Sequence, residues 1–131
     1  MANYNYGTTN YLGKIILMSK VQGQKYSVEY IEKTSTVDFI GDISLGGTID
    51  YAPIVSLLEQ SANTSEILTL NLKGLSFLNS SGISMLSKFV IGFRKRKNVQ
   101  LVVIGSKNIP WQAKSLKNLE KLLPGLKLQV E

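Results

Sequence analysis

The chain of 131 residues contains no cysteine and no histidine. Without cysteine it can form no disulfide, it offers no thiol nucleophile, and it has no thiolate ligand for zinc. Without histidine it lacks the base of a Ser-His-Asp triad, an imidazole general base and a common nitrogen ligand for metals. Most hydrolase mechanisms are therefore disfavoured, and we expect a protein that is not an enzyme and uses no cofactor or metal.

Long apolar runs are also missing. No run approaches the roughly 20 residues that a helix needs to span a bilayer, since the run Ile15–Met18 ends at Ser19. Residues 1–6 lack the basic segment that begins a signal peptide. We therefore expect a cytoplasmic protein with no membrane partner.

Acidic residues are scarce in the second half of the chain. Residues 1–66 contain four lysines and seven acids, a net charge of −3, whereas residues 67–131 contain eleven basic residues and two acids, a net charge of +9; together they give +6. Such a basic half can attract phosphates, nucleic acid or an acidic protein, or it can simply be a solvated surface. The cluster Arg94–Lys97 follows a predicted helix, where cations complement the helix dipole, and it has no interleaved aromatics for base stacking. Nucleic acid is therefore the weaker interpretation.

Apolar spacing predicts alternating strands and helices. Residues 26–31 alternate as a half-buried strand does, and residues 83–93 carry a helical apolar stripe. The predicted strands are Tyr26–Ile31, Thr36–Gly41, Ile67–Leu72, Leu101–Gly105 and Leu126–Val130, and the predicted helices are Tyr51–Ser61, Ile83–Phe93 and a third that starts at Pro110 and stops at Pro124. Strands that are joined through helices need crossover connections, so most of the sheet should be parallel or mixed.

The predicted fold class is therefore α/β, with one mixed central β-sheet of about five strands and helices packed on it. A chain of this length is expected to form one domain around one core. We assign residues 25–131 to that domain and residues 1–24 to an N-terminal extension. Within the extension, Leu12–Val21 is either an extra strand or part of a loosely docked arm.

The segment Leu75–Ile83 joins the buried strand 67–72 to the helix that follows. The first backbone N–H groups of a helix are unpaired, and the helix dipole favours negative charge at this end. One interpretation is that Ser80 or Ser81 caps the helix while Gly82 eases a tight turn. The other is that the site receives a phosphate.

Two other candidate sites are weaker. Gly41–Thr48 has the spacing of a phosphate-binding P-loop, but Gly47 stands where the lysine belongs, so nucleotide hydrolysis is not expected. The carboxylates Asp38, Asp42 and Asp50 sit near one loop, but their spacing matches no calcium-binding loop. We interpret them as solvated loop residues.

The run Leu75-Ser76-Phe77-Leu78-Asn79-Ser80-Ser81-Gly82 resembles the motif of the STAS family, and most of all that of the bacterial anti-sigma factor antagonists. Phe39–Ser44 is similar to the second strand of that family, and the order of elements agrees from about Tyr26 to Val130. The resemblance implies a STAS-like fold and a non-enzymatic regulator of transcription. It implies a serine-kinase anti-sigma factor-like ATPase as the protein partner, with a phosphatase that reverses the modification.

By position, the resemblance implies that Ser80 is the phosphorylation site. Asn79 would present this acceptor, and Ser81 and Gly82 would shape the turn. The implied partner-binding surface consists of Asn79, Ser80, Ser81, Gly82, Ser84, Ser87, Lys88, Asp42 and Ser44. A phosphate on Ser80 would add about −1.5 to −2 charge at a helix start, which the helix tolerates but a surface built for a hydroxyl does not.

Three departures from the family pattern favour an alternative function. Asn79 replaces an aspartate, Ser44 replaces an acidic residue in a loop that is longer than usual, and the chain ends at Glu131 without the last helix of the family. The alternative is a scaffold or an anionic-ligand-sensing module that has lost regulation by phosphorylation.

Overall fold

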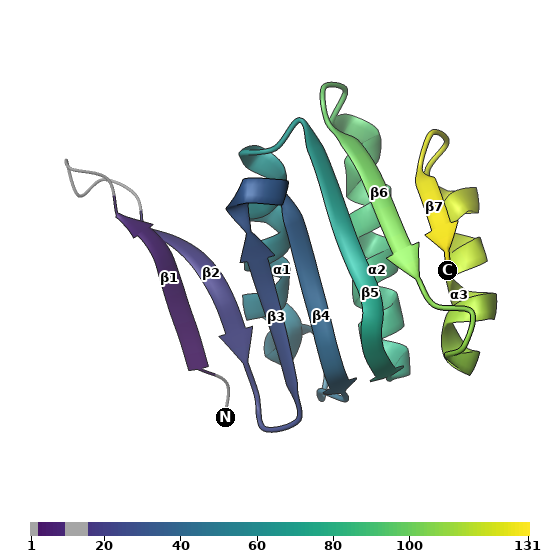
Figure 1. Ribbon diagram of the computed structural model, residues 1–131, viewed down its shortest axis with the longest axis horizontal. Coiled ribbons are helices and arrows are strands. Elements are labelled where there is room, and N and C mark those ends of the chain that lie inside the picture. The colour runs from purple at the N-terminus through teal and green to yellow at the C-terminus, as the bar shows by residue number, and fades with distance from the viewer. Residues whose placement is uncertain (1–2, 10–15) are drawn as a thin grey trace.

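The structure is a computed structural model of the chain, and it describes residues 3–9 and 16–131. The strands form one seven-stranded sheet whose spatial order follows the chain from β1 to β7 (Figure 1). The strands are β1 Asn3–Thr9, β2 Ile16–Gln22, β3 Tyr26–Ile31, β4 Thr36–Ile43, β5 Ile67–Leu78, β6 Gln100–Gly105 and β7 Lys127–Val130. The helices are α1 Thr48–Asn63, α2 Ser80–Gly92 and α3 Pro110–Leu122, with 3₁₀ turns η1 Glu32–Thr34 and η2 Phe93–Lys95.

The sheet has an antiparallel half and a parallel half. Strands β1 to β4 pair antiparallel, whereas β4 to β7 pair parallel. Each parallel connection needs a crossover, and α1, α2 and α3 supply the three crossovers. All three helices lie behind the sheet in Figure 1, so they cover the same face. The predicted mixed α/β fold of a single sheet with packed helices is confirmed.

The sheet contains more than the five strands expected, because β1 and β2 extend it beyond β3. β2 pairs with β3 through Lys20↔Glu29 and Val21↔Val28, and Val21 is fully buried. The extra-strand interpretation of Leu12–Val21 holds for residues 16–21, whereas residues 12–15 lie outside the described residues. The domain boundary at residue 24 stays a prediction.

The core lies between the sheet and the three helices. Alternate residues of β5, Leu68, Leu70 and Leu72, are buried, as are Leu101 and Val103 of β6. This is the period of two that brings every second side chain to one face of a strand. None of the described helices is long and apolar enough to cross a membrane.

The elements that lead to the serine motif are longer than predicted. β5 runs to Leu78 because its parallel pairing with β4 continues as far as Ile43↔Leu78, and α2 starts at Ser80 rather than Ile83. The pairing of β5 with β6, by contrast, ends at Asn71↔Ile104. β5 therefore delivers the serines directly to the first turn of a helix.

Beyond the point where β6 stops pairing with β5, residues of helix α3 form hydrogen bonds to β5. The fully buried Gln112 donates from Nε2 to the carbonyl oxygens of Leu72 and Leu75 at 2.6 and 3.0 Å. The indole N–H of Trp111 also donates to the Leu75 carbonyl at 3.1 Å. Buried backbone acceptors are costly when unpaired, so these bonds hold the end of β5 in place.

Candidate functional site

Two helix starts meet at one edge of the sheet. β4 and β5 end side by side, and the backbone N–H of Asn79 donates to the carbonyl of Ile43 at 3.2 Å. The loop 44–47 leads from β4 into α1, whereas β5 passes into α2 through Asn79 alone. The carboxyl ends of parallel strands are where ligands and partners commonly meet α/β folds.

Asn79, and not a serine, caps helix α2. Its backbone is extended, with φ −76° and ψ 174°, and its Oδ1 accepts from the N–H of Gly82 at 3.0 Å. This is the geometry of an N-cap side chain that satisfies one orphan donor of the first turn. The interpretation of Ser80 or Ser81 as the cap is therefore wrong, because the residue before them already fills that role.

Both polar atoms of the Asn79 side chain are used. Besides Gly82, Oδ1 accepts from the Tyr51 hydroxyl at 2.5 Å, while Nδ2 donates to the Leu45 carbonyl at 2.9 Å and lies 3.4 Å from Ser44 Oγ. An aspartate has no donor when ionised, so it would place a carboxylate oxygen against the Leu45 carbonyl. The departure from the family pattern at this position therefore fits the loop of this chain.

Tyr51 connects α1 to Asn79 and to the loop 44–47. Its hydroxyl donates to Asn79 and lies 3.4 Å from the backbone N of Leu45, which donates to it. The ring is 1% exposed, and burial raises the pKa of its hydroxyl above the ordinary value, against a smaller opposing effect of the Leu45 N–H. The hydroxyl therefore stays protonated at neutral pH and can donate to Asn79.

Gly82 allows α2 to approach Tyr51 and the end of β5. A Cβ at this position would overlap Cδ1 of the buried Leu78 and would lie 2.6 Å from the Tyr51 hydroxyl oxygen. The role assigned to Gly82 from the sequence was to shape the turn. In the structure its lack of a side chain permits close packing between α1, β5 and α2.

The hydroxyl of Ser80 remains exposed at the first residue of α2. It forms no hydrogen bond within the described part of the chain. Ser81 is half-buried, beside a small cleft of about 130 Å³ that it shares with Thr48 of α1 and Lys88 of α2. A group attached to Ser80 would therefore project into solvent next to both helix starts.

The other predicted partner-binding residues differ in how exposed they are and in whether they form hydrogen bonds. Ser84 and Lys88 are exposed on α2, but the Ser87 hydroxyl donates to the Ile83 carbonyl of its own helix at 2.9 Å. Ser44 lies next to Asn79, and Asp42 is exposed at the end of β4, opposite Phe77 of β5. The structure thus brings Asp42 and Ser44 to the same edge as Ser80.

Sequence reasoning missed two exposed apolar side chains at this edge. Ile49, in the first turn of α1, is 87% exposed, and Phe77, near the end of β5, is 48% exposed. In sequence an isolated isoleucine or phenylalanine looks like a core residue, because apolar side chains are usually buried. Only the three-dimensional structure shows that these two face solvent.

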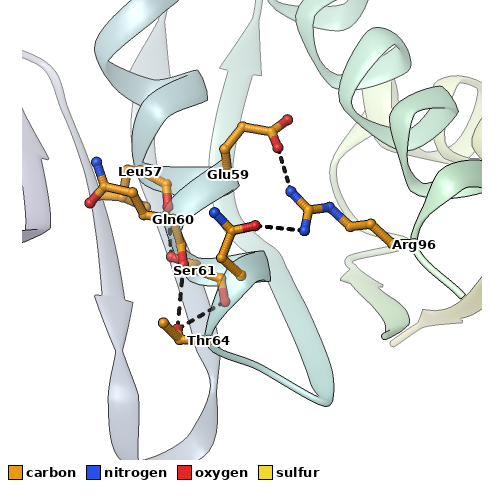
Figure 2. Close-up of polar contacts among 7 residues, drawn as sticks. Leu57, Glu59, Gln60, Ser61, Thr64 and Arg96 are labelled. Carbon is orange, nitrogen blue, oxygen red and sulfur yellow. Dashed lines mark hydrogen bonds and ion pairs between the residues drawn. The ribbon is translucent and has the colours of Figure 1, made fainter. Parts of the chain in front are cut away.

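The basic cluster at the other end of α2 is partly engaged in structural contacts. Arg96 donates to the Glu59 carboxylate and the Asn63 side chain of α1, both at 2.7 Å, as Figure 2 shows for Glu59. Arg94 donates from Nε to the Leu122 carbonyl at the end of α3, at 2.7 Å. These contacts agree with the interpretation that the cluster stabilises helix ends.

The candidate carboxylates do not converge. Asp38 accepts from the Asn71 amide at 3.0 Å, and Asp50 accepts from the Gly46 N–H at 3.2 Å. Within residues 3–9 and 16–131, no group of three or more acidic, histidine or cysteine side chains could hold a metal ion.

No protein-family model matches the sequence, and no curated protein matches it. The fold is similar to solved structures from Pseudomonas aeruginosa. A chain of the complex of the diguanylate cyclase SiaD with its activator SiaC has a TM-score of 0.64 at 12% identity, covering 86% of this chain and 98% of that one. Apo-SiaC has a TM-score of 0.61 at 9% identity, covering 100% and 98%. A further SiaC structure has a TM-score of 0.58 at 11% identity, covering 100% and 99%. At these identities the likeness shows the fold.

Proposed function

We propose that this chain is a non-enzymatic regulatory protein that binds a protein partner and is switched by phosphorylation of Ser80. The observation that carries the proposal is the free hydroxyl of Ser80. It is exposed on the first residue of α2, and Asn79 performs the capping that would otherwise occupy it. A kinase can reach such a hydroxyl without unfolding the helix.

The surroundings of Ser80 tolerate a phosphate. Phosphorylation adds about −1.5 to −2 charge, and the unpaired N–H groups and dipole of a helix start favour negative charge. The capping bonds of Asn79 need not change, because they use none of the atoms of Ser80. A partner surface shaped for a neutral hydroxyl would instead be repelled or crowded, so the fold stays and the interface fails.

The resemblance to anti-sigma factor antagonists suggests a serine-kinase anti-sigma factor-like ATPase as the partner, a phosphatase that restores the hydroxyl, and a cytoplasmic place of action. The fold likeness to SiaC supports one part of this proposal, the binding of a protein partner, since SiaC is described as the activator in a complex with SiaD. A protein of this fold can therefore act through protein–protein contact.

A charge at Ser80 is expected to weaken partner binding at least about tenfold, on the order of 1.4 kcal/mol. Partners would be captured from the native cells on the wild-type protein and identified by mass spectrometry, and their affinity for Ser80→Asp would then be measured. Ser56→Asp is the matched control, because Ser56 is exposed on α1 and lies outside the proposed surface. Equal affinity of one partner for wild type and Ser80→Asp would reject the switch and favour the scaffold or ligand-sensing alternative.

A further inference from the structure

A hollow of about 680 Å³ lies beside the Ser80 site, between the β2–β3 turn, the end of β4 and the start of α1. Its size is within the range of roughly 300–1,000 Å³ that is usual for ligand pockets. Leu45 lines it, and the same residue is bonded to Asn79 and Tyr51 through its backbone. The loop 44–47 therefore lines the hollow and also contacts Asn79, the residue before Ser80.

The walls of the hollow are held by backbone contacts. The N–H of Asp42 donates to the Lys25 carbonyl at 2.9 Å, which ties the end of β4 to the β2–β3 turn. The loop is held from the other side by Asn79. A hollow that is formed before binding costs a partner less ordering free energy than one that must assemble.

Two exposed apolar side chains line the hollow. Ile49 comes from α1 and is 87% exposed, and Phe77 comes from β5 and is 48% exposed. Single exposed apolar residues are normal, but side chains from separate elements that gather around one concavity mark an interaction site. Because they stand out toward solvent, a polypeptide segment can cover them better than a small molecule.

The charges of the rim favour a basic occupant. The charged residues that line the hollow are Asp42, Asp50 and Lys25. Asp50 accepts a hydrogen bond from Gly46, whereas the Asp42 carboxylate is exposed and has no side-chain partner in the part of the chain that the structure describes. Lys25 is not within ion-pair distance of either carboxylate. An arginine or lysine of a partner could therefore pair with Asp42 without breaking an existing bond.

We propose that the hollow takes a partner segment that inserts an apolar side chain between Ile49 and Phe77 and places an adjacent basic side chain on Asp42. This inference rests on the proposed function, because it describes how the partner would dock next to Ser80. The inference adds that the docking segment of the partner carries an apolar side chain and a basic side chain, and not an acidic one.

The test is selection of short random peptides, displayed on phage, against the whole wild-type protein. We expect enriched peptides to carry an aromatic or branched apolar residue close to an arginine or lysine. Affinity of an enriched peptide should fall at least about tenfold for Ile49→Ser and for Asp42→Asn. It should be unchanged for Ile67→Ser, which removes another exposed isoleucine, 56% exposed, at the start of β5 and outside the hollow.

Urea unfolding of each variant would show that its stability equals that of the wild type, since both substituted residues of the hollow are exposed. Enriched peptides without basic residues, or peptides that bind Ile49→Ser and Asp42→Asn as well as wild type, would overturn the proposal. This outcome is separate from the Ser80→Asp result. A hollow that binds peptides as expected, with a partner insensitive to Ser80→Asp, would reject the switch alone.

Discussion

Replacement of Gly41 by alanine is expected to lower the free energy of unfolding by roughly 2–5 kcal/mol. Gly41 has φ +96°, a left-handed conformation that costs other residues roughly 1–2 kcal/mol. A Cβ would also overlap the carbonyl oxygen of Lys25 and lie 3.0 Å from Cα of Tyr26. These are backbone atoms that cannot rotate away, and overpacking of this kind costs about 1–3 kcal/mol.

Gly125→Ala is the matched control for this prediction. Gly125 has nearly the same φ, +92°, but an added Cβ would have no atom within 4 Å. It should therefore lose only the roughly 1–2 kcal/mol of conformational strain. The measurement is the urea midpoint and slope of both variants and the wild type. Equal losses would show that the contact with Lys25 does not hold the β2–β3 turn against β4.

Gly82→Ala is expected to destabilise the protein by about 1–3 kcal/mol, because the added Cβ must displace Leu78 or Tyr51. Leu78 is 3% exposed and Tyr51 is 1% exposed, so neither side chain has free space to enter. A displaced Tyr51 would also lose its bond to Asn79, at a cost of roughly 0.5–1.5 kcal/mol.

The same helix supplies the control. Gly92 of α2 is helical, and a Cβ there would meet no atom within 4 Å, so Gly92→Ala should be neutral or stabilising by up to about 1 kcal/mol. Thermal and urea unfolding of the pair would separate helix propensity from packing. If Gly82→Ala matched or exceeded the stability of Gly92→Ala, α2 could not pack as closely on α1 as the structure shows.

Gly41 and Gly82 both permit close contacts that support the proposed binding surface. Gly41 permits the turn that forms one wall of the hollow, and Gly82 permits the approach of α2 that places Ser80 beside the loop 44–47. A partner surface built from a turn, a loop and two helix starts depends on such contacts, because no single element carries it. Loss of binding in either variant should therefore be compared with its loss of stability.

Much of the fold could be predicted from the sequence because its signals are local. The alternation of β5 and the helical stripe of α2 are visible within short windows, and Leu70, Leu86 and Phe89 are buried as the pattern indicates. β1 left no such signal, since Asn3–Thr9 contains no branched aliphatic residue. It joins the sheet by pairing with β2, which only the tertiary structure can show.

The site was predicted less completely because its contacts are between residues distant in sequence. The motif correctly located a serine at a helix start, but the bonds that join the capping residue Asn79 to Tyr51 and Leu45 link residues far apart in the sequence. From the sequence, Asn79 replaces an aspartate and presents the acceptor, whereas the structure adds that its amide donates to the Leu45 carbonyl. The exposure of Ile49 and Phe77 likewise depends on where β4 and β5 end and where α1 begins.

The central claim, that Ser80 is a regulatory phosphorylation site, is tested most directly by peptide mass spectrometry on the protein isolated from its native cells. Trypsin should release Gly74–Lys88 as one peptide, which contains Ser80 together with Ser76, Ser81, Ser84 and Ser87 as internal controls. We predict phosphate on Ser80, in a proportion that changes with growth or stress conditions. Complete absence of phosphate from Ser80 under all conditions, with the peptide itself detected, would contradict the account.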